Sequence, residues 1–186
     1  MLNRISIDGY FASLNEETFG MDWFVHDPEV DVALRSGRGT LDTLILGGRT
    51  YRGFERSWVP ILHNPQAPQS MRAVAEELTA MTKIVFSKET GELTWANTKR
   101  YNGSVGDVAR SLKEGEGTDI MVMGSGTIVQ QLAREGLIDE YVFILTPVVA
   151  GKGKPLFEYV DRFGLMLIEA KAFASGNVVL RYRLQQ

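Results

Sequence analysis

The sequence predicts an α/β fold with a mostly parallel central sheet, helices on both of its faces, and an antiparallel strand at the C-terminus. Short apolar runs typical of buried strands alternate with segments of helical periodicity along most of the chain. Parallel strands need such helical crossovers between them. The last two apolar runs, Leu165–Phe173 and Val178–Leu184, flank turn residues and predict a β-hairpin. The 186 residues suit a single domain spanning residues 1–186.

The other elements follow from β-forming runs, apolar periodicity and capping residues. Asp27, followed by Pro28 and Glu29, predicts a helix start, and this helix is expected to end near Gly37. Ser104-x-x-Asp107 resembles a capping box and predicts another helix start. The expected strands are residues 2–8, 43–46, 83–86, 95–101, 119–123 and 141–149. The expected helices are residues 28–37, 70–81, 104–113 and 127–134, and one that begins at about residue 50.

Composition excludes several classes of function. The chain has no cysteine, which excludes disulfides, thiolate catalysis and cysteine-based zinc sites, and its two histidines have no metal-ligand spacing, so we expect no metal. A net charge of −3 argues against a general nucleic-acid binder. No apolar run is long enough for a membrane span or a signal peptide, so we expect a cytoplasmic protein.

Two of the expected strands end in glycine-rich turns that precede a helix. These turns are Gly47-Gly48 and Gly124-Ser125-Gly126. Glycine lets a phosphate approach the backbone, and the start of a helix offers unpaired N–H groups. Neither turn is a Rossmann fingerprint or a Walker motif, and each could simply be a tight connection. Because both turns are expected at one edge of the sheet, they predict a site for the phosphates of a nicotinamide dinucleotide.

Side chains beside these turns refine the prediction. Arg49 could bind phosphate oxygens as a fork or pair with a surface acid, and Thr50 could donate to phosphate or cap the helix. Ser87-Lys88 follows the expected strand 83–86 and could hold a ribose 2′-phosphate, which would favour NADPH over NADH. The alternative for Lys88 is a solvated side chain at the end of a strand.

The candidate chemical groups are two acids and a set of aromatic residues. Asp8 ends the first expected strand and could orient a substrate or form an Asx-turn with Gly9. Asp27 could act as an acid, although its role as a helix cap already explains it. The sequence lacks Gly-x-Ser-x-Gly and a positioned histidine, which argues against a serine hydrolase. The aromatic residues that could line a flat-ring pocket, or belong to the core, are Trp23, Tyr51, Phe54 and Trp58.

Six short motifs occur in order along almost the whole chain. They are SIDGYFA at 6–12, LGGRTY at 46–51, KIVFS at 83–87, MGSG at 123–126, GLIDE at 136–140, and TPVVAGKG at 146–153 with Leu156-Phe157. In this order they resemble the C-terminal domain of the riboflavin-biosynthesis reductase, a bacterial family with the dihydrofolate reductase fold. The resemblance implies a three-layer, NADPH-binding α/β fold and often a homodimer.

The resemblance also implies roles for residues at matching positions. It places Asp8, Ala12 and Trp23 near nicotinamide and substrate, Gly47–Thr50 and Gly124–Ile128 at the diphosphate, and Ser87-Lys88 near the 2′-phosphate. The expected cofactor-binding residues are therefore Ala12, Gly47, Gly48, Arg49, Thr50, Ser87, Lys88, Gly124, Ser125, Gly126, Thr127 and Ile128.

These observations predict an NADPH-dependent reductase that transfers hydride to the C=N or C=O group of a pterin- or aminopyrimidine-like molecule. It would be similar to 5-amino-6-(5-phosphoribosylamino)uracil reductase, but stand-alone, without the deaminase domain that often precedes that enzyme. The proton would come from Asp8, Asp27 or water. One alternative is a non-catalytic nucleotide-binding or regulatory module on the same fold. Another is a structural protein whose glycine turns bind no dinucleotide.

Overall fold

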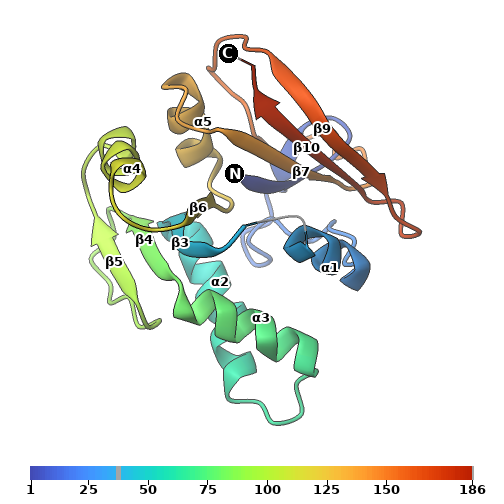
Figure 1. The fold of residues 1–186 in the computed structure, drawn as a ribbon. Coiled ribbons are helices and arrows are strands. Elements are labelled where there is room, and N and C mark those ends of the chain that lie inside the picture. Colours follow the sequence, from blue (N-terminus) through green and yellow to red (C-terminus); the bar gives the residue numbers. More distant parts are fainter. Residues whose placement is uncertain (37–38, 186) are drawn as a thin grey trace. The chain divides into compact units, whose positions relative to one another are not determined.

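The computed structural model describes residues 1–36 and 39–185, which form two compact units. One unit, here called the insert unit, comprises residues 40–125. The other, here called the outer unit, comprises residues 1–39 and 126–186. Each unit has its own sheet (Figure 1).

The insert unit contains a four-stranded, entirely parallel sheet in the order β5-β4-β3-β6. Because all four strands run the same way, their carboxyl ends lie at one edge of the sheet. Figure 1 shows α4 on one side of this sheet and α2 with α3 on the other. The strands are β3 (Leu41–Gly47), β4 (Thr82–Phe86), β5 (Thr98–Tyr101) and β6 (Asp119–Val122). The helices are α2 (Gly48–Leu62), α3 (Gln69–Ala80) and α4 (Val105–Glu114).

The core of the insert unit lies between the sheet and the α2–α3 pair. Burial of large apolar side chains against the sheet is the main force that fixes α2 relative to the ends of the strands. The buried members of this core are Leu44, Leu46, Tyr51, Leu78, Met81, Val85 and Trp95.

The outer unit contains a mixed four-stranded sheet in the order β1-β7-β10-β9. β1 is parallel to β7, whereas β10 is antiparallel to both of its neighbours. A core of Val30, Ile144 and Val179 joins α1 to this sheet. The strands are β1 (Leu2–Ile5), β7 (Glu140–Leu145), β9 (Leu165–Ala172) and β10 (Val178–Leu184), with a separate pair of β2 (Tyr10–Ala12) and β8 (Lys154–Pro155). The helices are α1 (Pro28–Ser36) and α5 (Gly126–Arg134).

Local signals in the sequence predicted the helix starts and the hairpin correctly. The Asp27 carboxylate accepts a hydrogen bond from the Glu29 N–H at 2.8 Å, and Ser104 Oγ accepts one from the Asp107 N–H at 3.2 Å. β9 and β10 form the expected terminal hairpin. The predicted end of the first helix, near Gly37, lies outside the described residues. No helix among the described residues is long and apolar enough to cross a membrane.

Several expected strands are shorter than predicted, among them residues 95–101, of which only Thr98–Tyr101 is a strand. The strand expected at residues 2–8 ends at Ile5, because Ser6–Gly9 forms a turn in which the Gly9 N–H donates to Ser6 O at 3.0 Å. The strand expected at residues 141–149 ends at Leu145, shortly before Pro147, which has no N–H to continue a ladder. The hydrogen bonds divide the strands among a parallel four-stranded sheet, a mixed four-stranded sheet and the β2–β8 pair. The predicted α/β fold class is confirmed, including the antiparallel strand at the C-terminus, which is β10.

Candidate functional site

Three strand ends of the insert unit meet the first turn of α2. β3 ends at Gly47, and the next residue begins the helix. Ser87, directly after β4, lies against Gly48: a Cβ atom there would be 2.6 Å from Ser87 Oγ. Gly124, after β6, has a φ of +63° and lies against Thr50, since a Cβ atom there would be 2.8 Å from Thr50 Cγ2. The glycines therefore allow close approaches that any side chain would prevent.

The N-terminus of α2 has the properties of an anion site. Its N-cap is Gly47, which has no side chain to accept the first N–H groups, and its first turn contains no acidic residue. The N–H groups at the start of a helix have no partner within the helix, and the helix dipole is positive there. The sequence-based alternative that Thr50 caps this helix is wrong, because α2 begins at Gly48. Arg49 is exposed in the same turn.

Ser87 and Lys88 begin the loop after β4. Ser87 Oγ accepts a hydrogen bond from the Glu89 N–H at 3.1 Å, which turns the backbone directly after the strand. Lys88 is exposed and has no ion-pair partner within residues 1–36 and 39–185. A hydroxyl and an ammonium group thus follow β4 at the edge of the sheet where α2 begins.

The rest of the second glycine turn leads into the outer unit. Ser125 has a φ of +54°, and Gly126 is the first residue of α5. A Cβ atom at Gly126 would lie 2.5 Å from the ring of Phe11, so this glycine is required by packing within the outer unit. Thr127 is exposed, whereas the Ile128 side chain is buried, which leaves only its backbone for a ligand.

Both candidate acids are held as carboxylates in the outer unit. Hydrogen bonds from the Ser6 side chain and from the Ala150 and Gly151 N–H groups lower the pKa of Asp8 to about 2. The Ala150 N–H lies 2.9 Å from Asp8 Oδ1, and the Gly151 N–H lies 2.7 Å from Oδ2. Donation from the Ser175 hydroxyl, followed by backbone N–H groups, lowers the pKa of Asp27. Neither group carries a proton at neutral pH.

The candidate aromatic residues lie in different surroundings. Trp23 is half-buried in the outer unit and packs edge-on against Phe24, and its buried Nε1 has no hydrogen-bond partner among the described residues. Tyr51 is fully buried in the core of the insert unit, and Phe54 and Trp58 pack partly buried against that core. Ala12 ends β2 and is buried in the outer unit.

A buried polar network beside Tyr51 was not predicted from the sequence. The Tyr51 hydroxyl donates to Glu55 Oε1 at 2.6 Å and accepts from the Trp95 N–H at 2.9 Å. Tyr51 and Glu55 are one turn apart on α2, which is a signal that the sequence contains. Trp95 is 40 residues further along the chain, so no local pattern connects it to Glu55.

Comparisons with known proteins agree with this fold. A sequence model described as the RibD C-terminal domain matches residues 1–180. The uncharacterized proteins YyaP and YwjB of Bacillus subtilis strain 168 are 26% and 30% identical over 180 residues. These matches cover 96% of this chain, 90% of YyaP and 92% of YwjB.

Solved structures share the dihydrofolate reductase-like fold with this chain. A putative riboflavin biosynthesis protein from Shewanella sp. PV-4 has a TM-score of 0.68 at 21% identity, over 100% of this chain and 97% of that one. A pyrimidine reductase-like protein from Corynebacterium diphtheriae has a TM-score of 0.61 at 14% identity, over 100% and 90%. A diaminohydroxyphosphoribosylaminopyrimidine deaminase/5-amino-6-(5-phosphoribosylamino)uracil reductase from Thermotoga maritima has a TM-score of 0.63 at 14% identity, over 99% of this chain and 55% of that protein.

Proposed function

The chain belongs to the RibD C-terminal domain family, and on that premise we propose that it is an NADPH-dependent reductase of a small, flat, nitrogen-containing molecule. The observation that carries the proposal is the meeting of three strand ends at the uncapped N-terminus of α2. Gly48 and Gly124 make close approaches there, and Ser87 adds a hydroxyl. This arrangement suits a phosphate group that is bound mainly by backbone N–H groups.

Residues of the insert unit would bind the phosphates of the dinucleotide. Gly47–Thr50 and Gly124-Ser125 would bind the diphosphate, with Arg49 as a cationic partner. Ser87 and Lys88 would bind the 2′-phosphate of NADPH, which NADH lacks. For Ala12 and Gly126–Ile128, which belong to the outer unit, the family resemblance alone implies a role in cofactor binding. When bound, NADPH supplies a hydride from nicotinamide C4.

The proposed substrate is a pterin- or aminopyrimidine-like compound. The family and the names of two related structures, one a pyrimidine reductase-like protein and one an aminouracil reductase, support this class. Trp23, which the family resemblance places near nicotinamide and substrate, is the proposed aromatic contact for the substrate ring. Because Asp8 and Asp27 are both ionised, we propose that the proton comes from water.

Titration of the protein with NADPH and with NADH, followed by tryptophan fluorescence, tests the cofactor assignment. We expect micromolar binding of NADPH and much weaker binding of NADH. Equal affinities would refute the 2′-phosphate assignment, and no binding of either would refute the reductase. Lys88→Met should reduce the affinity for NADPH and leave that for NADH unchanged.

A non-catalytic nucleotide-binding module is the second candidate function. In such a module the glycine turns would bind the nucleotide without hydride transfer, and the hydrogen-bonded carboxylates of Asp8 and Asp27 would only stabilise the fold. Oxidation of NADPH in the presence of a panel of pterins, aminopyrimidines and quinones separates the two functions. Steady turnover with any acceptor identifies a reductase, whereas NADPH binding without turnover across the whole panel favours the module.

A further inference from the structure

The loop that begins with Ser87 and Lys88 ends on a single carboxylate of α2. This segment, here called the 87–95 loop, places Thr94 and Trp95 against Glu55. Glu55 Oε1 accepts hydrogen bonds from the Thr94 N–H at 3.2 Å, the Thr94 hydroxyl at 2.7 Å and the Trp95 N–H at 3.0 Å. Trp95 is itself buried. The far end of the loop is thus fixed to the helix whose N-terminus is the proposed diphosphate site.

Two arginines hold the middle of the same loop. Arg52 Nη1 donates to Glu92 O at 2.8 Å and to Glu55 Oε2 at 3.3 Å, which joins the arginine and the carboxylate into one network. Arg100, on β5, donates to Gly91 O. Both guanidinium groups are therefore engaged with the loop and its anchor, and Lys88 remains as the exposed cation of the loop.

Arg52 also affects the charge of the loop. Its Nε lies 4.0 Å from the Glu89 carboxylate, next to Lys88 in the sequence. An unrestrained carboxylate beside Lys88 would repel a phosphate group, because like charges a few ångströms apart disfavour each other. The network thus orders the backbone that carries Lys88, and it also places a guanidinium group at ion-pair distance from the neighbouring acid.

We propose that Glu55, Arg52 and Arg100 form a clamp that positions Ser87 and Lys88 for the 2′-phosphate and so sets the preference for NADPH over NADH. The inference rests on the proposed function. Glu55 lies on the same helix as Gly48, so a single rigid element fixes the distance between the diphosphate and 2′-phosphate subsites. We assign them as positioning residues, because their hydrogen bonds go to the loop and to one another.

Glu55→Gln tests the clamp, with the exposed Glu76→Gln on α3 as a control that removes the same charge. Dissociation constants for NADPH and NADH are measured by calorimetry for each protein. Displacing a charge-assisted contact costs about tenfold in affinity. Glu55→Gln should therefore weaken the binding of NADPH by about this factor and the binding of NADH by less than about twofold. A ratio of the two dissociation constants that stays as in the wild type, whether both bindings are unchanged or both weaken equally, would overturn the inference.

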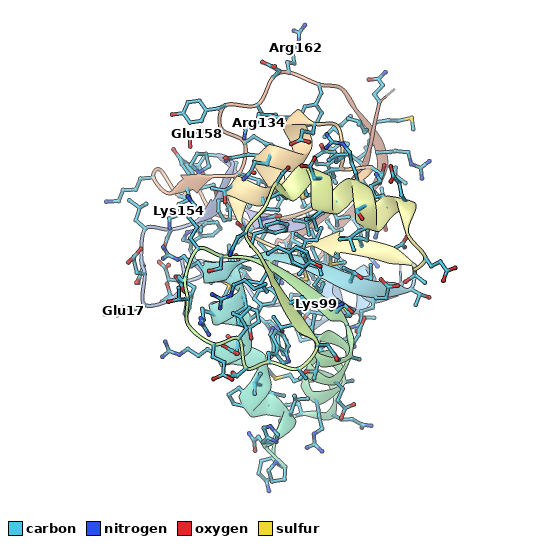
Figure 2. All side chains as sticks on the ribbon, turned by 90° about the vertical axis from the view of Figure 1, so that its left-hand side faces the viewer. Glu17, Lys99, Arg134, Lys154, Glu158 and Arg162 are labelled. Atoms are coloured by element: carbon cyan, nitrogen blue, oxygen red, sulfur yellow. The ribbon has the colours of Figure 1, made fainter. Side chains whose placement is uncertain are left out.

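Arg100→Met provides a second test that does not alter α2. Its control is Lys99→Met, since Lys99 is exposed on the same strand and is labelled in Figure 2. Arg100→Met should lower the NADPH preference and Lys99→Met should not. If Lys88→Met lowers the preference but neither Glu55→Gln nor Arg100→Met does, the clamp is refuted and the proposed function stands. If Lys88→Met has no effect either, the proposed 2′-phosphate site fails as well.

Discussion

Lys83 is a fully buried lysine that should make the stability of the protein depend on alkaline pH. It lies on β4, and its Nζ donates to three carbonyl oxygens at the C-terminal end of α3: Leu78 at 2.8 Å, Thr79 at 3.0 Å and Met81 at 2.7 Å. The Trp95 ring centroid is 4.7 Å from the same atom. The ammonium group thus satisfies carbonyls that the helix leaves unpaired, at the negative end of its dipole.

Burial lowers the pKa of Lys83 from 10.5 to about 8. The unfolded chain therefore binds this proton more tightly than the folded protein does, and the charge opposes folding at full strength below about pH 8. Stability should rise with pH between about 8 and 10.5, where the unfolded chain still holds the proton and the folded protein has released it. The total change corresponds to about 3 kcal/mol, of which about 2 kcal/mol falls between pH 8 and 10.

The assay is urea denaturation at several pH values from 7 to 10, for the wild type and for Lys83→Met. The difference in free energy of unfolding, wild type minus variant, should rise by about 2 kcal/mol between pH 8 and 10. Taking this difference cancels the contributions of other titrating groups, which are the same in both proteins. Among these groups, burial lowers the pKa of the Met1 amino group to about 6 and raises the pKa values of Tyr51 and Tyr141 to about 12. The exposed Lys99→Met should give no such slope. A difference that is flat from pH 8 to 10 would refute the reasoning.

Three further predictions concern the site, the acid and the surface. Gly48→Ala places a Cβ atom against Ser87 Oγ and should weaken NADPH binding by about tenfold. Gly103→Ala is the control, because a Cβ atom there would have nothing within 4 Å, and it should leave NADPH binding unchanged. Calorimetry compares the two variants, and equal effects on NADPH binding would contradict the role of the close approach at Gly48. Because its pKa is lowered to about 2, Asp8 stabilises the fold above its ordinary pKa of 3.8, and this contribution disappears as pH falls through 2. Asp8→Asn should therefore be less stable than the wild type at pH 7, and its free energy of unfolding in urea should fall less steeply with acid. An unchanged dependence on acid would show that the hydrogen bonds of Asp8 to the Ala150 and Gly151 N–H groups do not contribute to stability. We propose that the chain forms a homodimer through β9, an edge strand on which Ile168 is 44% exposed. Ile168→Lys should then yield monomers in sedimentation experiments, and a monomeric wild type would refute the proposal.

The features predicted from the sequence are those determined by neighbouring residues. Asp27 and Ser104 cap helices because their side chains reach N–H groups two or three residues ahead. The glycine turns and Ser87 could be placed at one edge of a sheet because strand–helix alternation predicts parallel strands. Local patterns were sufficient for the family and the class of fold, and the phosphate-binding roles of the glycine turns and Ser87 stay a prediction.

The features that were missed depend on residues far apart in the chain. Asp8 binds backbone N–H groups more than 140 residues away, so its low pKa has no local signature. The pairing of β2 with β8 joins two very short segments from opposite ends of the chain. The contact of Glu55 with Thr94 and Trp95 requires knowledge of where the 87–95 loop returns to α2.

The division of the outer unit between the two ends of the chain has a consequence for how the protein is made. β1 pairs with β7, in the register of Leu2 with Val142, so the first strand leaves the ribosome long before its partner. In contrast, every strand partner within the insert unit comes from one continuous stretch of chain. Because distant pairings must first overcome the entropy of closing a long loop, the β1–β7 pairing should form late during folding. Until then β1 is an unpaired strand, and the period of greatest risk of aggregation falls before the last third of the chain is synthesised.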